Sequence, residues 1–217
     1  MPRPKQRTPA LRDRVLHAAL AILADEGAGA LTTRKVAAAA ATSIPAVYEL
    51  FGDKAGLVRE VYFEGFRRLG GRFDELDHTD DPRADLLAVI ATYRSFVREN
   101  SVLAGVMFSR PFADLDPSAK DLRATSTVRK FIVGHVRRCI EAGVLAGDAT
   151  DVAHVVLALA QGLALQEAAG WLGTSKASVN RRWMLAFNAT LDGLREAQPD
   201  ARQRLVRSSP LHPCAPR

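Results

Sequence analysis

Four short side chains follow one another in the first quarter of the chain: Ser43, Ile44, Pro45 and Ala46. Short side chains let a backbone come close to another surface. Ile44 and Ala46 can contact thymine methyl groups, and the Ser43 hydroxyl can hydrogen-bond a base edge or a phosphate. This pattern is typical of a segment that reads DNA bases.

Residues that suit phosphate oxygens lie on either side of these four. Tyr48 offers a hydroxyl, and Lys54 stands at a predicted helix start, where its charge adds to the free backbone N–H groups. Thr33, Arg34 and Lys35 have the same place at the start of an earlier predicted helix. Such contacts would fix the position of the chain on DNA without reading its sequence.

Two helices joined by a tight turn must position these side chains. The alanine-rich residues 33–40 predict the first helix, with Thr32 or Thr33 as its N-cap. The turn falls at Ala41 and Thr42, and the serine that follows caps a second short helix. In a helix-turn-helix, the second helix enters the major groove and the first holds it rigidly.

Small residues are expected where the two helices cross, and the chain supplies Ala37, Ala38, Ala40 and Ala41. We expect Phe51 to pin the motif to the first helix of the chain, over residues 10–26, rather than touch DNA. Leu50 fits either the core or the groove. An alanine-rich hairpin in an ordinary core would have the same spacing, so the residues alone leave both interpretations open.

The run from Thr32 to Leu57, TTRKVAAAAATSIPAVYELFGDKAGL, resembles the N-terminal domain of the TetR (tetracycline repressor) family. The resemblance extends over about residues 10–60 and implies a homodimeric transcriptional regulator with one such motif per subunit. It implies phosphate contacts for Tyr48 and Lys54, and puts residues 43–46 and 50 against bases or backbone. The chain departs from the family where Ala41-Thr42 replaces Gly-Val and Leu50 replaces a frequent His.

Apolar residues recur at helical spacing over the rest of the chain, and no stretch alternates as a strand does. The sequence predicts an all-α fold of about nine helices, over residues 10–26, 33–40, 44–50, 54–76, 83–100, 103–108, 116–142, 152–172 and 175–197.

Four regions follow from these patterns. We expect a basic flexible arm over residues 1–9, a DNA-binding domain over 10–60 with its motif at about 32–51, an effector-binding and dimerisation domain over 61–197, and a disordered tail over 198–217.

The composition limits the class of protein. Of 217 residues, 47% are hydrophobic, and the net charge of +6 suits a polyanionic partner. The two cysteines, Cys139 and Cys214, predict neither a disulfide framework nor a metal site. The basic N-terminus lacks the apolar core of a signal peptide, and no run approaches the roughly 18 uncharged apolar residues of a membrane span. We therefore expect a cytoplasmic protein without a membrane partner, a metal or a cofactor.

Residues 152–172 are apolar on nearly every face, which predicts a dimer interface formed with the last helix. A central helix of a monomeric core is the alternative. This half also resembles TetR regulators with a Trp-His-Gly signature, of which only Gly162 is present. The predicted interface residues are Val156, Leu159, Leu163, Trp183, Phe187 and Leu191.

An effector pocket would draw on the aromatic, sulfur-containing and polar side chains of the same region. An amide inside so apolar a helix as 152–172 should find a partner, either a ligand or the dimer mate. The candidate ligand-binding residues are Phe66, Tyr93, Phe96, Met107, Phe108, Phe112, Phe131, His135, Gln161 and Gln166.

The leading hypothesis is a repressor that binds a palindromic double-stranded DNA operator as a homodimer and is released by a small-molecule effector. A non-specific architectural DNA-binding protein is one alternative. A small helical enzyme is another, although Asp114, Asp116, Asp121, His135 and Cys139 form no nucleophile–base pair or catalytic motif. We therefore predict no catalytic residues.

Overall fold

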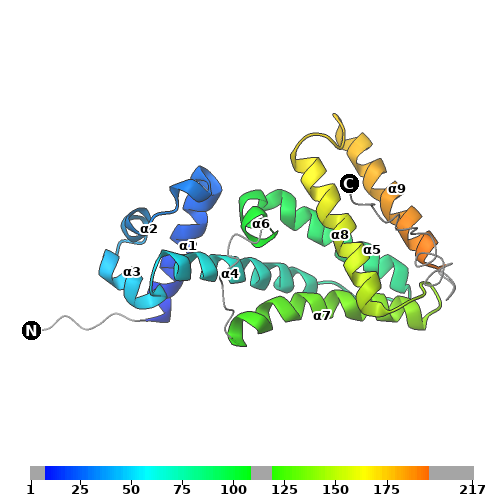
Figure 1. Cartoon of the computed structure of the whole chain (residues 1–217), viewed down its shortest axis with the longest axis horizontal. Helices are drawn as coiled ribbons and strands as arrows, with labels where there is room; N and C mark the ends of the chain where they lie inside the picture. Colours follow the sequence, from blue (N-terminus) through cyan, green and yellow to red (C-terminus); the bar gives the residue numbers. More distant parts are fainter. Residues whose placement is uncertain (1–7, 109–118, 196–217) are drawn as a thin grey trace, which may run out of the picture. The chain divides into compact units, whose positions relative to one another are not determined.

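A computed structural model describes residues 8–108 and 119–195, which form nine α-helices, one short 3₁₀ helix and no strand (Figure 1). The all-α prediction is confirmed. The helices are α1 (Pro9–Glu26), α2 (Thr33–Ala39), α3 (Ile44–Phe51), α4 (Lys54–Asp74), α5 (Pro82–Glu99), α6 (Ser101–Phe108), α7 (Ala119–Glu141), α8 (Ala149–Ala168) and α9 (Lys176–Arg195), with the 3₁₀ helix at Ala28–Ala30.

The described residues group into two compact units, one drawn from residues 8–78 and 87–132 and the other from residues 79–86 and 133–195. The predicted division at residue 60 falls inside the first unit and within α4. That division separates functions rather than packed units, and it stays a prediction.

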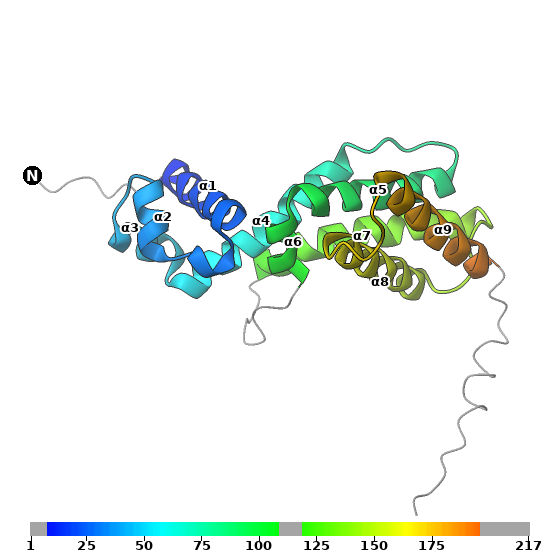
Figure 2. The same cartoon turned by 90° about the horizontal axis from the view of Figure 1, so that it is seen from above.

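In the first unit, α2 and α3 pack against α1 and the start of α4, as Figures 1 and 2 both show. Apolar residues at helical spacing make this possible, since Val15, Leu23, Val36, Val47 and Leu57 are all fully buried. Farther along α4, Gly65 lies so close to the Met107 side chain of α6 that an added Cβ would meet its sulfur. These contacts hold the short helices of the motif on two longer ones.

Side-chain caps begin the helices of the motif, and two of them, at Thr32 and Ser43, lie at predicted residues. The Thr32 hydroxyl accepts from the Lys35 N–H at 3.2 Å, so the first of the two candidate threonines is the cap. Ser43 caps α3, and Asp53 caps α4 by accepting from the Gly56 N–H at 2.7 Å. Each cap satisfies a backbone donor that the helix itself leaves free.

The turn between α2 and α3 keeps its left-handed residue although glycine is absent. Ala41 has a φ of +49°, the one positive φ of a non-glycine residue in the described part of the chain. Its N–H donates to the Ala38 carbonyl at 3.1 Å, and the Thr42 N–H donates to the Ala37 carbonyl at 2.9 Å. These two bonds form a Schellman motif. The replacement of Gly-Val by Ala41-Thr42 therefore leaves a glycine-type turn in place, built on a strained alanine.

The predicted helix crossing needs a correction. Ala37 and Ala40 are buried, as expected, but Ala38 and Ala41 are exposed. On a helix only residues three or four apart share a face, so one crossing cannot use all four alanines.

In the second unit, α8 and α9 lie side by side. Asp148 caps α8, with its carboxylate accepting from two backbone N–H groups. Trp183 of α9 stacks on Phe187 and donates its indole N–H to Glu167 of α8 at 2.7 Å. The second helix is thereby fixed to the end of the first.

The predicted end of α8 at residue 172 was too late, because the helix stops at Ala168. Gly170 has a φ of +74°. The Trp171 N–H donates back to the Gln166 carbonyl, and the Gly170 N–H to Glu167. The helix therefore ends in a Schellman motif at Gly170. The predicted range instead ended the helix just before the next glycine, Gly173.

One buried carboxylate joins the start of α5 to α7 within the second unit. Asp85 accepts hydrogen bonds from the Thr79 hydroxyl at 2.7 Å and from the Arg138 guanidinium at 2.6 Å. The Thr79 hydrogen bond, together with Arg138, lowers the pKa of Asp85 to about 2. The carboxylate therefore stays charged at neutral and mildly acidic pH.

Candidate nucleic-acid interface

Helix α3 has one buried edge and one exposed edge. Val47 and Phe51 are buried, whereas Ile44 and Tyr48 are 36% and 46% exposed. The members of each pair are four residues apart, so each pair lies on one face of the helix. Ser43 and Pro45 are also exposed, and Ala46 is half-buried. The structure therefore presents the predicted base-reading residues to solvent on a helix anchored by its other edge.

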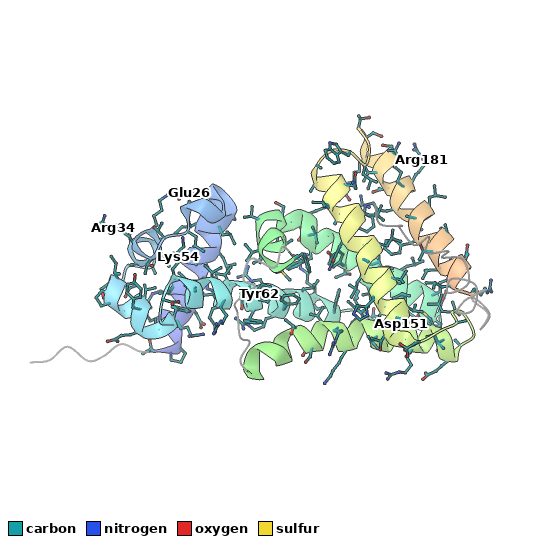
Figure 3. All side chains as sticks on the ribbon, in the orientation of Figure 1. Glu26, Arg34, Lys54, Tyr62, Asp151 and Arg181 are labelled. Atoms are coloured by element: carbon teal, nitrogen blue, oxygen red, sulfur yellow. The ribbon has the colours of Figure 1, made fainter. Side chains whose placement is uncertain are left out.

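The predicted phosphate-binding residues lie at helix starts or on this exposed edge. Arg34 is exposed in the first turn of α2, Lys54 is exposed in the first turn of α4, and Thr33 is half-buried. Figure 3 labels Arg34, which projects from α2, and Lys54 at the start of α4. The Ser43 oxygen caps α3, which leaves its hydroxyl hydrogen to donate to an acceptor on DNA.

Lys35, another predicted phosphate ligand, is already paired with a carboxylate of its own chain. Its ammonium forms an ion pair with Glu26 at the end of α1. Both side chains are 48% exposed. A surface pair of this kind contributes little stability and exchanges readily, so a phosphate would have to compete with Glu26 for the lysine.

Arg12 of α1 also contacts the motif, although the sequence does not mark it. Its guanidinium donates to the Leu50 carbonyl at 3.1 Å, lies 2.6 Å from a Glu60 oxygen of α4, and sits 4.8 Å from the centre of the Phe51 ring. Leu50 itself is half-buried. No local motif marks Arg12, since its partners lie far along the chain. The prediction that Phe51 holds the motif against the first helix is confirmed.

Four of the six predicted dimer-interface residues face the interior of their own chain. The structure buries Val156, Trp183, Phe187 and Leu191. They therefore cannot form the surface offered to a partner. The other two, Leu159 and Leu163, are half-buried.

Other apolar residues of α8 and α9 are exposed instead. Leu165 and Leu185 are each 70% exposed, and Val155 and Met184 about half. Gly162 lies between Val155 and Leu165 on the same face of α8, and an added Cβ there would meet nothing within 4 Å. We call these five residues the outer face of α8 and α9.

Among the described residues, α8 is one helix long and apolar enough to cross a membrane, and only 28% of its most apolar window is buried. A single helix of this kind is weak evidence for a membrane protein. It does show how much apolar surface the outer face leaves open.

The predicted ligand-binding aromatics of the first unit form two groups. In one, the Phe108 ring lies 6.2 Å from Phe66 and 5.7 Å from Tyr93. Burial raises the pKa of the Tyr93 hydroxyl, which therefore remains protonated. In the other, Phe131 stacks on Phe73 at 5.1 Å. Phe96 and Met107 are buried in the same unit.

The polar candidates are less well placed. Gln161 and Gln166 are exposed on α8, so the expectation that such an amide pairs with a ligand or with the dimer mate stays a prediction. His135 is buried in α7. Phe112 lies outside the described residues. In the described part of the chain, no group of three or more His, Cys, Asp or Glu residues could hold a metal ion.

A cleft of about 340 Å³ opens in the first unit among α1, α4 and the start of α6. None of the predicted ligand-binding residues lines it; its walls include His17, Leu20, Arg68, Glu99, Asn100 and Leu103.

Two family descriptions match the chain. Residues 15–61 match bacterial regulatory proteins of the tetR family, and residues 86–194 match the tetracyclin repressor-like C-terminal domain. The first match contains the whole α2–α3 motif. No curated protein matches the chain.

Solved structures share the fold. A protein of unknown function from a Rhodococcus species is 25% identical, with a TM-score of 0.76 over 89% of this chain and 100% of that one. The TetR family transcriptional regulator PfmR from Thermus thermophilus is 20% identical, with a TM-score of 0.60 over 86% and 100%. A putative TetR-family regulator from Rhodococcus sp. is 21% identical, with a TM-score of 0.66 over 85% and 100%.

Proposed function

Because the chain belongs to the TetR family of bacterial transcriptional regulators, we propose that it is a repressor that binds a palindromic operator as a homodimer and leaves it when a small molecule binds. Regulators of this family are generally not enzymes, and we assign no catalytic residue. A regulator that binds the bacterial chromosome acts in the cytoplasm, and we assign this protein to that compartment.

The observation that carries this proposal is the division of α3 into two edges. The anchored edge, Val47 and Phe51, fixes the helix on its unit, and the free edge, Ile44 and Tyr48, is available to DNA. Ile44 then reads a base and Tyr48 holds a phosphate, with Arg34 and Lys54 at neighbouring helix starts as further phosphate ligands.

Homodimerisation supplies the second α3, about 34 Å away, as successive major grooves require. We assign the interface to the outer face of α8 and α9. It combines an apolar stripe with Gly162, which lowers helix stability unless a close helix contact offsets the loss. Two helices from each subunit would form a four-helix bundle.

The effector site is assigned to the group formed by Phe66, Tyr93 and Phe108 in the first unit. Phe66 and Phe108 are half-buried and Tyr93 is buried, as a pocket lining for an apolar or aromatic compound requires. α4 carries Phe66, and the same helix begins at the phosphate ligand Lys54. Effector binding would act on DNA affinity through this helix.

The test is nuclease protection of the DNA upstream of the protein's own gene by the purified full-length chain. We expect one protected palindrome, bound at least about a thousandfold more tightly than random duplex DNA of equal length. Equal affinity for both DNAs at every salt concentration would identify a non-specific architectural protein and overturn the proposal.

A further inference from the structure

Arg12 contacts three elements of the first unit at once. It extends from α1, donates to the Leu50 carbonyl at the end of α3, and pairs with Glu60 of α4. The arginine side chain is 32% exposed and that of Glu60 only 17%. Because the pair is partly buried, solvent screens it less than it screens a surface pair.

The Leu50 carbonyl has a specific need for this donor. It lies in the last turn of α3, where carbonyls have no partner within the helix. The guanidinium satisfies it and also brings positive charge to the negative end of the helix dipole. The face of the same group rests on Phe51, the buried anchor of α3.

Only arginine can make all of these contacts together. Its planar fork directs one nitrogen to the carbonyl and another to the carboxylate, while its face stacks on a ring. A lysine carries one ammonium and would have to leave one partner. The second oxygen of Glu60 faces Arg67 at 3.7 Å, which continues the network along α4.

We propose that Arg12 is a positioning residue for DNA recognition: it fixes the end of α3 to α4 through Glu60, and it touches no DNA itself. The inference rests on the proposed function, because it assigns α3 as the reading helix. A shift of α4 would then reach α3 through Arg12 as well as through the direct packing of the two helices.

A purely electrostatic role for Arg12 and a positioning role predict opposite changes in DNA affinity when its partner Glu60 is substituted. If Arg12 acted only by attracting phosphates, Glu60→Gln would remove a nearby negative charge and strengthen DNA binding. If Arg12 positions α3, Glu60→Gln weakens binding to the specific site, because the fork loses its carboxylate. The two roles are therefore separated by one isosteric substitution.

The experiment measures the affinity of the full-length protein for its protected site and for random duplex DNA, at several salt concentrations. We expect Arg12→Gln, Arg12→Lys and Glu60→Gln each to weaken specific binding about tenfold, a loss that random DNA does not share. The double variant Arg12→Gln/Glu60→Gln should lose no more affinity than the worse single variant. The ion pair that Glu60→Gln removes is already lost in Arg12→Gln. Arg14→Gln, an exposed arginine of the same helix, is the matched charge control.

Thermal unfolding of each variant shows that binding is measured on folded protein, and Arg12→Lys retains the charge and stem if Arg12→Gln does not fold. Stronger specific binding by Glu60→Gln, or equal losses for Arg12→Gln and Arg14→Gln on both DNAs, would overturn the inference. Failure of the wild-type protein to prefer any site would overturn the proposed function instead.

Discussion

Helices α3 and α8 both expose apolar side chains, but they are anchored in different ways. α3 is short, and capping by Ser43 and burial of Val47 and Phe51 leave one orientation for it. α8 is long and apolar on nearly every face, and its packing against α9 helps to decide which residues turn inward. The exposed residues of α3 were therefore predictable from spacing, whereas those of α8 were not.

The strongest test of this contrast is Phe187→Ala, which removes a buried ring of α9 that stacks on Trp183. We expect a loss of about 3–5 kcal/mol in the free energy of unfolding, measured by urea denaturation, because the cavity adds to the lost burial. The loss should be the same at low and high protein concentration. Leu185→Ala, at an exposed neighbour, is the control. Its loss should vanish at low concentration, where a dimer contact no longer contributes.

Leu165→Glu tests the outer face directly. A carboxylate placed in an apolar interface, once per subunit, should raise the dimer dissociation constant at least about a hundredfold, or about 3 kcal/mol. Analytical ultracentrifugation measures the dimer, and operator affinity should fall with it. Ala142→Glu puts the same charge on an exposed position just after α7 and should leave the dimer intact. A dimeric Leu165→Glu protein would show that subunits pair elsewhere.

Substitutions of the two exposed residues of α3, Ile44 and Tyr48, should differ in their effect on DNA sequence specificity. Tyr48→Phe removes one phosphate hydrogen bond and should weaken binding to operator and random DNA alike by about 1 kcal/mol, roughly fivefold. Ile44→Ala should lose about the same amount at one operator base pair only. Binding titrations against single-base operator variants measure both. A uniform loss from Ile44→Ala would place that side chain away from the bases.

Local features of the fold followed from the sequence because they depend on neighbouring residues. The caps at Thr32, Ser43 and Asp53, and the free edge of α3, all involve partners within four positions. Contacts such as that of Arg12 with the Leu50 carbonyl span 38 positions and have no local signature.

The same limit explains one error. Trp183 and Phe187 were assigned to the dimer interface because they share an apolar face, yet the sequence does not show which face of α9 meets α8. Periodicity finds an apolar surface, but it does not distinguish the chain's own helix from that of a second copy.

The smallest expected effect concerns the turn that supports α3. Ala41 holds a left-handed conformation that costs an alanine about 1–2 kcal/mol, and glycine avoids this cost but gives up more freedom on folding. We therefore expect Ala41→Gly to raise the free energy of unfolding by about 0.5–1 kcal/mol in urea denaturation, with operator affinity unchanged. The matched control is Ala38→Gly, an exposed helical position three residues earlier. It should lower the free energy by a similar amount, because there glycine only loses helix propensity. Two changes of the same sign would mean that Ala41 is not strained, and that the turn tolerates alanine for another reason.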